Sequence, residues 1–230
     1  MGNSDEFEAA DWLQHQLWDA RKVIWPNRQP SLKELLDPGI AAEMLGIDFR
    51  AVPNLGQTRF NRSSVPFRTA GILDRQRRLI AISQEFAPEI QRFTAAHELG
   101  HWLLHDHHVM HRDRPMDGAA LHTSRPKEEL EADRFATFFL MPAKAVRTHF
   151  QRIFRVPGAL HFTDVTCFHL SPRDPNTLLY AEESSLEREL AVAGCSRYAD
   201  RRFNSLASEF GVSVTAMAIR IKELGLTRWP

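Results

Sequence analysis

Apolar residues recur at every third or fourth position in several stretches of this chain, a spacing that predicts amphipathic helices. The longest stretch runs from about Asp5 to Ile24, with Ser4 as a candidate N-cap residue. Pro26 and Pro30 then end the helical pattern. The same spacing predicts helices at residues 31–36, 41–45, 88–104, 127–140, 142–154 and 184–193, and two or three short helices within 201–226.

Alternating apolar and polar residues predict strands in the middle of the chain. The candidate strands are residues 47–52, 67–73 and 78–82, and the polar residues 74–77 join the last two as a hairpin. Residues 54–64 and the histidine-rich stretch 105–122 are expected to be loops. Several prolines in 156–176 favour irregular structure or short strands there.

The composition is that of a soluble globular protein, because 43% of the 230 residues are hydrophobic and 25% are charged. The 29 basic residues balance the 29 acidic ones, so the net charge gives no support for a nucleic-acid binder. Cys167 and Cys195 lie far apart and form no CxxC motif, which argues against a disulfide framework or a cysteine zinc site. The first ten residues lack the apolar segment of a signal peptide, and no apolar run reaches the ~20 residues of a membrane span. We therefore expect a soluble protein of the reducing cytoplasm.

An H-E-x-x-H motif, HELGH at residues 97–101, falls inside the helix predicted at 88–104. Positions i and i+4 of a helix share a face, so His97 and His101 can bind one metal ion. Glu98 can then reach a metal-bound water molecule. Both histidines share their face with apolar residues, and a metal ion would satisfy two imidazoles that point into the core. The alternative is two core histidines bonded to backbone groups, next to a solvated Glu98.

The next predicted helix, 127–140, supplies a third candidate ligand. Glu129 and Asp133 share one face of this helix, whose other positions are largely apolar. A buried Glu–Asp pair is costly without a cation or strong hydrogen bonds, and metal coordination by Glu129 offsets that cost. Asp133 is then expected to accept a hydrogen bond from the N–H group of a ligand imidazole. The alternative is a solvated acidic face, but the small Ala132 and Ala136 suit close helix packing instead.

His107 competes with Glu129 as the third ligand, because it lies six residues after His101, where a metzincin places its third histidine. That pattern needs a glycine midway to turn the chain, and Leu104 stands there. A clear Met-turn is also lacking, so His107 is the weaker candidate. The segment's other histidines are expected to be solvated loop residues, with an adventitious surface metal site as the alternative; they are His105, His108, His111 and His122.

The two motifs together resemble the ImmA/IrrE family of metallo-endopeptidases. The matching segments are AAHELGHWLLH, from Ala95 to His105, and EELEADRFATFFLMP, from Glu128 to Pro142. The segment LLDPGIAAEMLGIDFRAVPNL and the strands before the H-E-x-x-H helix also look like that family, so the resemblance covers roughly residues 35–154. It implies an α+β fold: a zincin-like domain with a small antiparallel or mixed sheet and an active-site helix, followed by a helical C-terminal region.

The same resemblance assigns His97, His101 and Glu129 as metal ligands and Glu98 as the catalytic base. It implies cleavage of a helix-turn-helix repressor, which derepresses stress-response or mobile-element genes, so such a repressor is the expected partner. Zinc suits two imidazoles and a carboxylate, with Mn²⁺ or Fe²⁺ as alternatives. We expect three parts: an N-terminal helical segment at 1–38, the zincin-like metallopeptidase domain at 39–155, and a C-terminal region with a helix-turn-helix-like tail at 156–230.

The predicted reaction is metal-assisted hydrolysis of a peptide bond. Three protein ligands leave one position for water, as in catalytic zinc sites. The metal lowers the pKa of that water toward ~7, and Glu98 takes the proton and passes it to the leaving amine. The group that stabilises the oxyanion stays open among Tyr180, His161, His169 and an arginine.

The tail, residues 206–224, resembles a helix-turn-helix, with Ala207 and Gly211 spaced for a tight turn and Ser213 placed to cap the second helix. A small helical bundle that packs on the peptidase domain is favoured over DNA binding, because the net charge is zero. Two alternatives to an endopeptidase follow: a metal-sensing DNA-binding regulator without proteolysis, and a toxin or effector hydrolase with the same site chemistry. The basic residues that DNA binding would use are Arg201, Arg202, Arg220 and Lys222.

Overall fold

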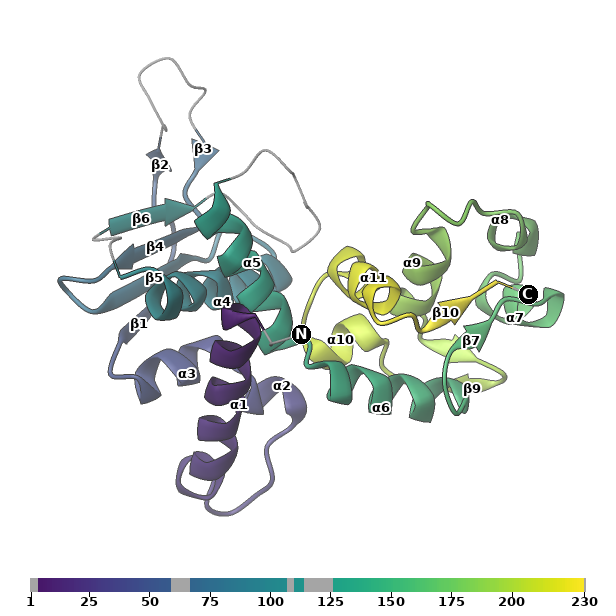
Figure 1. Cartoon of the computed structure of the whole chain (residues 1–230), viewed down its shortest axis with the longest axis horizontal. Helices are drawn as coiled ribbons and strands as arrows, with labels where there is room; N and C mark the ends of the chain where they lie inside the picture. The colour runs from purple at the N-terminus through teal and green to yellow at the C-terminus, as the bar shows by residue number, and fades with distance from the viewer. Residues whose placement is uncertain (1–3, 59–66, 107–109, 114–125, 230) are drawn as a thin grey trace. The chain divides into compact units, whose positions relative to one another are not determined.

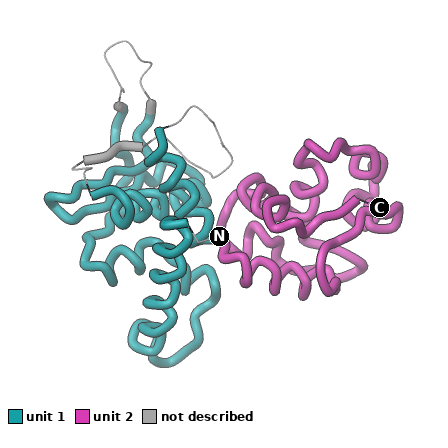
Figure 2. The backbone as a smooth tube through the Cα atoms, in the orientation of Figure 1, with its two compact units in different colours: residues 1–140 teal, residues 141–230 magenta. Residues whose placement is uncertain are grey.

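The computed structural model describes residues 4–58, 67–106, 110–113 and 126–229. The chain forms two compact units, Met1–Leu140 and Met141–Pro230 (Figure 1, Figure 2). The three-part division expected from the sequence, 1–38, 39–155 and 156–230, stays a prediction. None of the helices in the described part of the chain combines the length and the apolar character that a bilayer crossing requires.

The first unit is a mixed α+β structure, which confirms the predicted fold class. Its sheet has the strand order β1-β5-β4-β6, with β1 parallel to β5 and the other neighbours antiparallel. The strands are β1 (Asp48–Val52), β4 (Gly71–Asp74), β5 (Leu79–Ser83) and β6 (Met110–Asp113). A separate ribbon pairs β2 (Gln57–Thr58) with β3 (Phe67–Arg68). The helices are α1 (Asp5–Ile24), α2 (Leu32–Leu35), α3 (Pro38–Met44), α4 (Pro88–Leu104) and α5 (Lys127–Leu140).

Local capping fixes the short helices that lead into the sheet. The Ser31 hydroxyl accepts a hydrogen bond from the Glu34 backbone N–H, and the Glu34 carboxylate accepts one from the Ser31 backbone in return. The Asp37 carboxylate caps α3 by accepting hydrogen bonds from the Gly39 and Ile40 backbone N–H groups, and Gly46 ends that segment with φ of 71°. Ser4 occupies the N-cap position of α1, but the prediction that it caps the helix fails for the side chain, which makes no capping hydrogen bond.

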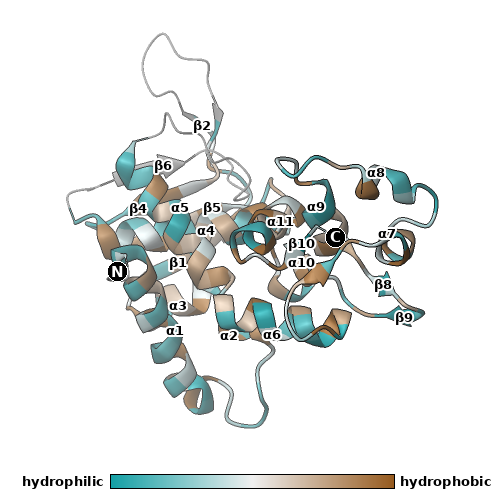
Figure 3. Cartoon of the chain, turned by 45° about the vertical axis from the view of Figure 1, so that its right-hand side comes forward, coloured by the Kyte–Doolittle hydropathy of each residue, from teal (hydrophilic) through white to brown (hydrophobic). Residues whose placement is uncertain are grey.

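Helix α4 is the centre of the first unit. It packs against β4 and β5 and also against α5, and α1 in turn packs against α5 (Figure 1). The surface helix α1 alternates hydrophilic and hydrophobic residues along its length (Figure 3). Its Leu13 and Leu17 are fully buried, whereas Trp12 and Trp18 are exposed. Residues 92–101 of α4 are all buried, so this helix is enclosed on every side and not only on its histidine face.

Two expectations about the β region are corrected. Residues 67–73 do not form one strand, because β3 pairs with β2 while β4 pairs with β5 and β6, and the chain changes partner between them. Neither 54–64 nor 105–122 is loop throughout, since β2 lies in the first and β6 in the second. Strand β6 forms through long-range pairing with β4, and β2 pairs with β3, the next strand along the chain. The local polar sequence gives no signal for either strand.

The second unit is mostly helical, as the sequence predicts. Residues 156–176, expected to be irregular or to form short strands, contain the short strand β7 (Leu160–His161), the helix α7 (Asp164–Leu170) and the start of α8 (Pro175–Leu179). The Thr163 hydroxyl caps α7 by accepting from the Thr166 N–H, and Asp174 caps α8. The elements are α6 (Ala143–Phe154), β7 (Leu160–His161), α7 (Asp164–Leu170), α8 (Pro175–Leu179), α9 (Glu187–Gly194), β8 (Arg197–Tyr198), β9 (Arg201–Arg202), α10 (Leu206–Phe210), α11 (Val214–Glu223) and β10 (Thr227–Arg228).

Candidate metal centre

The contact between α4 and α5 brings two histidines and a glutamate into one cluster. His97 Nε2 lies 3.0 Å from His101 Nε2. The Glu129 carboxylate completes the group, with oxygens 3.7 Å from His97 Nε2 and 3.4 Å from His101 Nε2. One donor atom from each residue lies within 4.8 Å of the other two. Two imidazoles and a carboxylate form the donor set of catalytic zinc sites.

The burial of this cluster suits a metal ion. Both histidines are completely buried, and the Glu129 side chain is 15% exposed. Neutral imidazoles carry one N–H and one lone pair each, so two Nε2 atoms facing each other and a carboxylate offer lone pairs to a shared cation. The residues present therefore fit the metal that the motif implies.

Asp133, expected from the sequence to accept a hydrogen bond from a ligand imidazole, lies next to His97. Its Oδ1 is 2.9 Å from His97 Nδ1, and its side chain is 10% exposed. When Nε2 of His97 holds a metal, Nδ1 carries the ring proton and donates it to Asp133. This contact fixes the orientation of the imidazole ring.

Residues 55–156 match the sequence profile of a peptidase family, described as the IrrE N-terminal-like domain. This range contains all three residues of the cluster and Glu98. Residues 55–156 are an IrrE N-terminal-like peptidase domain. A comparison with curated proteins gives no match. The chain thus carries a metallopeptidase domain with a candidate zinc site, which confirms the family and the enzyme class expected from the sequence.

Within the IrrE N-terminal-like domain, the side chain of Glu98 is fully buried and packs against strand β4. A Cβ atom added to Gly71 would collide with Glu98 Oε1 and would lie 2.7 Å from Thr94 Cγ2. Gly71 therefore makes the space in which the Glu98 carboxylate lies. No motif marks this glycine in the sequence, although a glycine inside a strand pattern is a general sign of a close approach.

His105 is not the solvated loop residue that the sequence suggested. It is 4% exposed and occupies the C-cap position of α4. Its Nδ1 lies 2.9 Å from His101 Nδ1, and its Nε2 lies 3.0 Å from Glu131 Oε2 on α5. The spacing of positions 97, 101 and 105, four residues apart, was the signal that could have placed His105 on the ligand face.

Arg75 fixes the end of α4 that carries His101. Its guanidinium donates hydrogen bonds of 2.6–2.9 Å to the carbonyl oxygens of His101, Trp102 and His105, and it lies 4.7 Å from the centre of the Trp102 ring. Partial burial lowers the pKa of Arg75 from its ordinary value, while the nearby Asp106 opposes that shift. A cation at a helix C-terminus also complements the helix dipole.

Several predicted residues lie elsewhere. The competing ligand His107 is outside the described residues, as are His108 and His122; His111 lies in β6, and its side chain is not described. Tyr180, His161 and His169 belong to the second unit, and their suggested role at the oxyanion stays a prediction.

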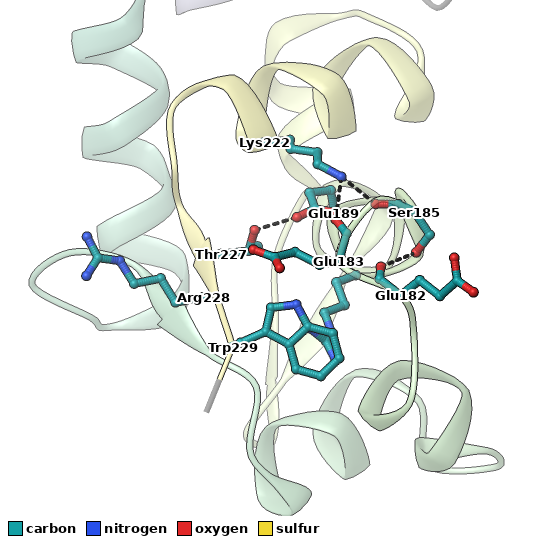
Figure 4. Close-up of a pocket in the computed structure, with 9 residues that line it drawn as sticks. Glu182, Glu183, Ser185, Glu189, Lys222, Thr227, Arg228 and Trp229 are labelled. Atoms are coloured by element: carbon teal, nitrogen blue, oxygen red, sulfur yellow. Dashed lines mark hydrogen bonds between the residues drawn. The ribbon is translucent and has the colours of Figure 1, made fainter.

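The second unit contains a polar cavity whose lining groups bind one another (Figure 4). Lys222 Nζ donates to the carbonyl oxygens of residues 183–185 at 2.7–3.0 Å. The Thr227 hydroxyl donates to Glu189 Oε1 at 2.5 Å, and the Arg188 guanidinium stacks on the Trp229 ring. These groups bind one another, so we assign the cavity lining to the stability of the second unit.

Proposed function

We propose that this protein is a zinc-dependent endopeptidase that hydrolyses a peptide bond in a protein substrate. A helix-turn-helix repressor is the expected substrate, from the resemblance to the ImmA/IrrE family. The observation that carries the proposal is the convergence of His97 and His101 of α4 with Glu129 of α5, whose donor atoms lie within 4.8 Å of one another. Glu98 follows His97 on α4.

The side chains divide the chemistry among them. His97, His101 and Glu129 would hold the zinc ion, and Asp133 would keep the His97 imidazole oriented. A bound zinc ion supplies a Lewis acid that polarises the scissile carbonyl and acidifies water. Glu98 takes the proton of the attacking water and delivers it to the leaving amine. Its burial against Gly71 limits the positions that its carboxylate can adopt.

The direct test is cleavage of a candidate repressor by the zinc-loaded protein, followed by mass spectrometry of the products. The variant Glu98→Gln should lower the cleavage rate by about 10²–10⁴-fold, because it removes the general base, and should keep the metal. The matched control is Glu85→Gln, an exposed glutamate in the segment before α4, which should cleave like the wild type. Full activity of Glu98→Gln would refute its role as the base.

The alternative of a DNA-binding regulator has weaker support. Helices α10 and α11 follow one another with Gly211 at φ of 65° between them, which fits the helix-turn-helix-like tail expected from the sequence. However, Arg220 Nε donates to the Met141 carbonyl, Lys222 donates to three carbonyls, and Arg201 donates to the Ile153 carbonyl. Because these cations hold the second unit together, we propose a structural or substrate-docking role for the tail.

A further inference from the structure

We infer that His105 and Glu131 form a positioning relay that holds the His101 imidazole in the tautomer and orientation needed to bind the metal. The inference rests on metal binding by the His97, His101 and Glu129 cluster. It concerns residues that never touch the metal themselves.

The geometry of the relay is a chain of three side chains. His101 Nδ1 lies 2.9 Å from His105 Nδ1, and His105 Nε2 lies 3.0 Å from Glu131 Oε2. His101 is completely buried and His105 is 4% exposed, so bulk water does not compete for these contacts. The planes of the two imidazole rings are tilted by 54° and their centroids lie 5.0 Å apart. The rings therefore meet through their nitrogen atoms and are not stacked face to face.

The contacts allow one assignment of the ring protons in the metal-bound protein. A hydrogen bond between two imidazole nitrogens needs one N–H and one lone pair. Because His101 Nε2 faces the metal cluster, its ring proton is on Nδ1, and His105 Nδ1 must accept it. The proton of His105 is then on Nε2, from which it donates to Glu131. The reverse arrangement would put a proton on His101 Nε2 and block metal binding.

The negative end of the relay is held in place by a lysine. Lys127 Nζ lies 2.9 Å from Glu131 Oε1. Each oxygen of the Glu131 carboxylate therefore has a partner, Lys127 at Oε1 and His105 at Oε2. A carboxylate oxygen accepts hydrogen bonds, so His105 Nε2 is the donor in its contact with Glu131.

Helix α5 therefore serves both ligand histidines of α4. Asp133 contacts His97 directly at 2.9 Å, and Glu131 reaches His101 through His105. The outer partners of zinc-bound histidines are usually a carboxylate, a carbonyl or water, and their loss weakens metal binding by about 10–100-fold. For His101, the outer partner is the imidazole of His105, which lies between His101 and the Glu131 carboxylate.

The test is the zinc dissociation constant of the full chain, measured by competition with a chelating dye. The variant His105→Leu keeps the bulk and removes the acceptor, so the dissociation constant should rise by about 10–100-fold. The variant His105→Asn can place Oδ1 where Nδ1 lies and should stay within about threefold of the wild type. The control is His15→Leu, an exposed histidine of α1, which should bind zinc like the wild type.

Two further measurements separate positioning from folding. Thermal unfolding of the zinc-free proteins should differ little between His105→Asn and the wild type. Glu131→Leu should weaken zinc binding in the same direction as His105→Leu, and the double variant should bind no more weakly than His105→Leu alone, because the two residues act in series. If His105→Leu does not fold, Glu131→Leu decides, with weakened binding in support and wild-type binding against.

Three results would overturn the relay. They are unchanged zinc binding in His105→Leu, equal weakening in His105→Leu and His105→Asn although both fold, and additive effects in the double variant. A wild type that binds no zinc would instead refute the proposed function and the relay together.

Discussion

Gly71 has no side chain, and a Cβ atom at this position would collide with the Glu98 carboxylate. Strand β4 thereby becomes part of the candidate active site, although none of its side chains is a candidate ligand. Glu98, Gly71 and Thr94 are packed so closely that the carboxylate has little freedom to move. A general base gains from such restriction, because proton transfer depends on its position relative to the water molecule.

The substitution Gly71→Ala should displace the Glu98 carboxylate and lower the rate of peptide cleavage by about 10²-fold, as a shift near 1 Å can do. Zinc content should stay at the wild-type level, since the three ligands are untouched. The control is Gly158→Ala, where an added Cβ meets no atom within 4 Å and activity should be unchanged. Wild-type activity in Gly71→Ala would show that the position of Glu98 does not limit the reaction.

At the scale of elements, the site depends on how closely α4 and α5 approach. A Cβ added to Gly100 would lie 3.0 Å from the Ala132 Cα and 3.1 Å from Phe135 Cδ1. Gly100 and Ala132 thus let the histidines of one helix meet the carboxylates of the other. The distances of 3.4 Å and 3.7 Å between Glu129 and the two imidazoles depend on this approach.

The substitution Gly100→Ala has two opposing effects on the stability of the fold. Alanine favours the helix over glycine by about 1 kcal/mol, whereas overpacking of a dense core costs about 1–3 kcal/mol. Because the nearest neighbour is backbone, which cannot move aside as a side chain does, we expect net destabilisation and weaker zinc binding. Urea unfolding of the zinc-free protein and zinc competition measure the two effects. A more stable variant with wild-type zinc affinity would contradict this account of the helix contact.

The elements that the sequence predicted are those whose pattern is local. Helices α1 and α5 carry long apolar periodicity and have the predicted bounds, and the H-E-x-x-H spacing placed both histidines on one face of α4. Strand β6 could not be predicted, because its pairing with β4 joins residues some forty positions apart. Helix α7 was missed because Val165 and Phe168 are exposed, so its apolar residues do not mark a buried face.

For the site, the sequence predicted the candidate metal ligands His97, His101 and Glu129 and one supporting carboxylate, Asp133, because all four carry motif spacing. The roles of His105, Glu131 and Gly71 depend on which helix or strand lies opposite, and only tertiary structure determines that.

At the scale of the whole molecule, every residue of the metal cluster and of its supporting contacts belongs to the first unit. The second unit is held together by its own cations, which bind backbone carbonyls. The proposed function therefore depends on the binding of a catalytic metal ion by His97, His101 and Glu129.

The most direct test of that claim is the zinc content and zinc affinity of four purified proteins: the wild type, Glu129→Ala, Glu128→Ala and His107→Ala. The account predicts about one tightly bound zinc per chain in the wild type, in Glu128→Ala and in His107→Ala, and strongly weakened binding in Glu129→Ala alone. Zinc binding that survives in Glu129→Ala but is lost in His107→Ala, or a wild type that binds no zinc after reconstitution, would contradict it.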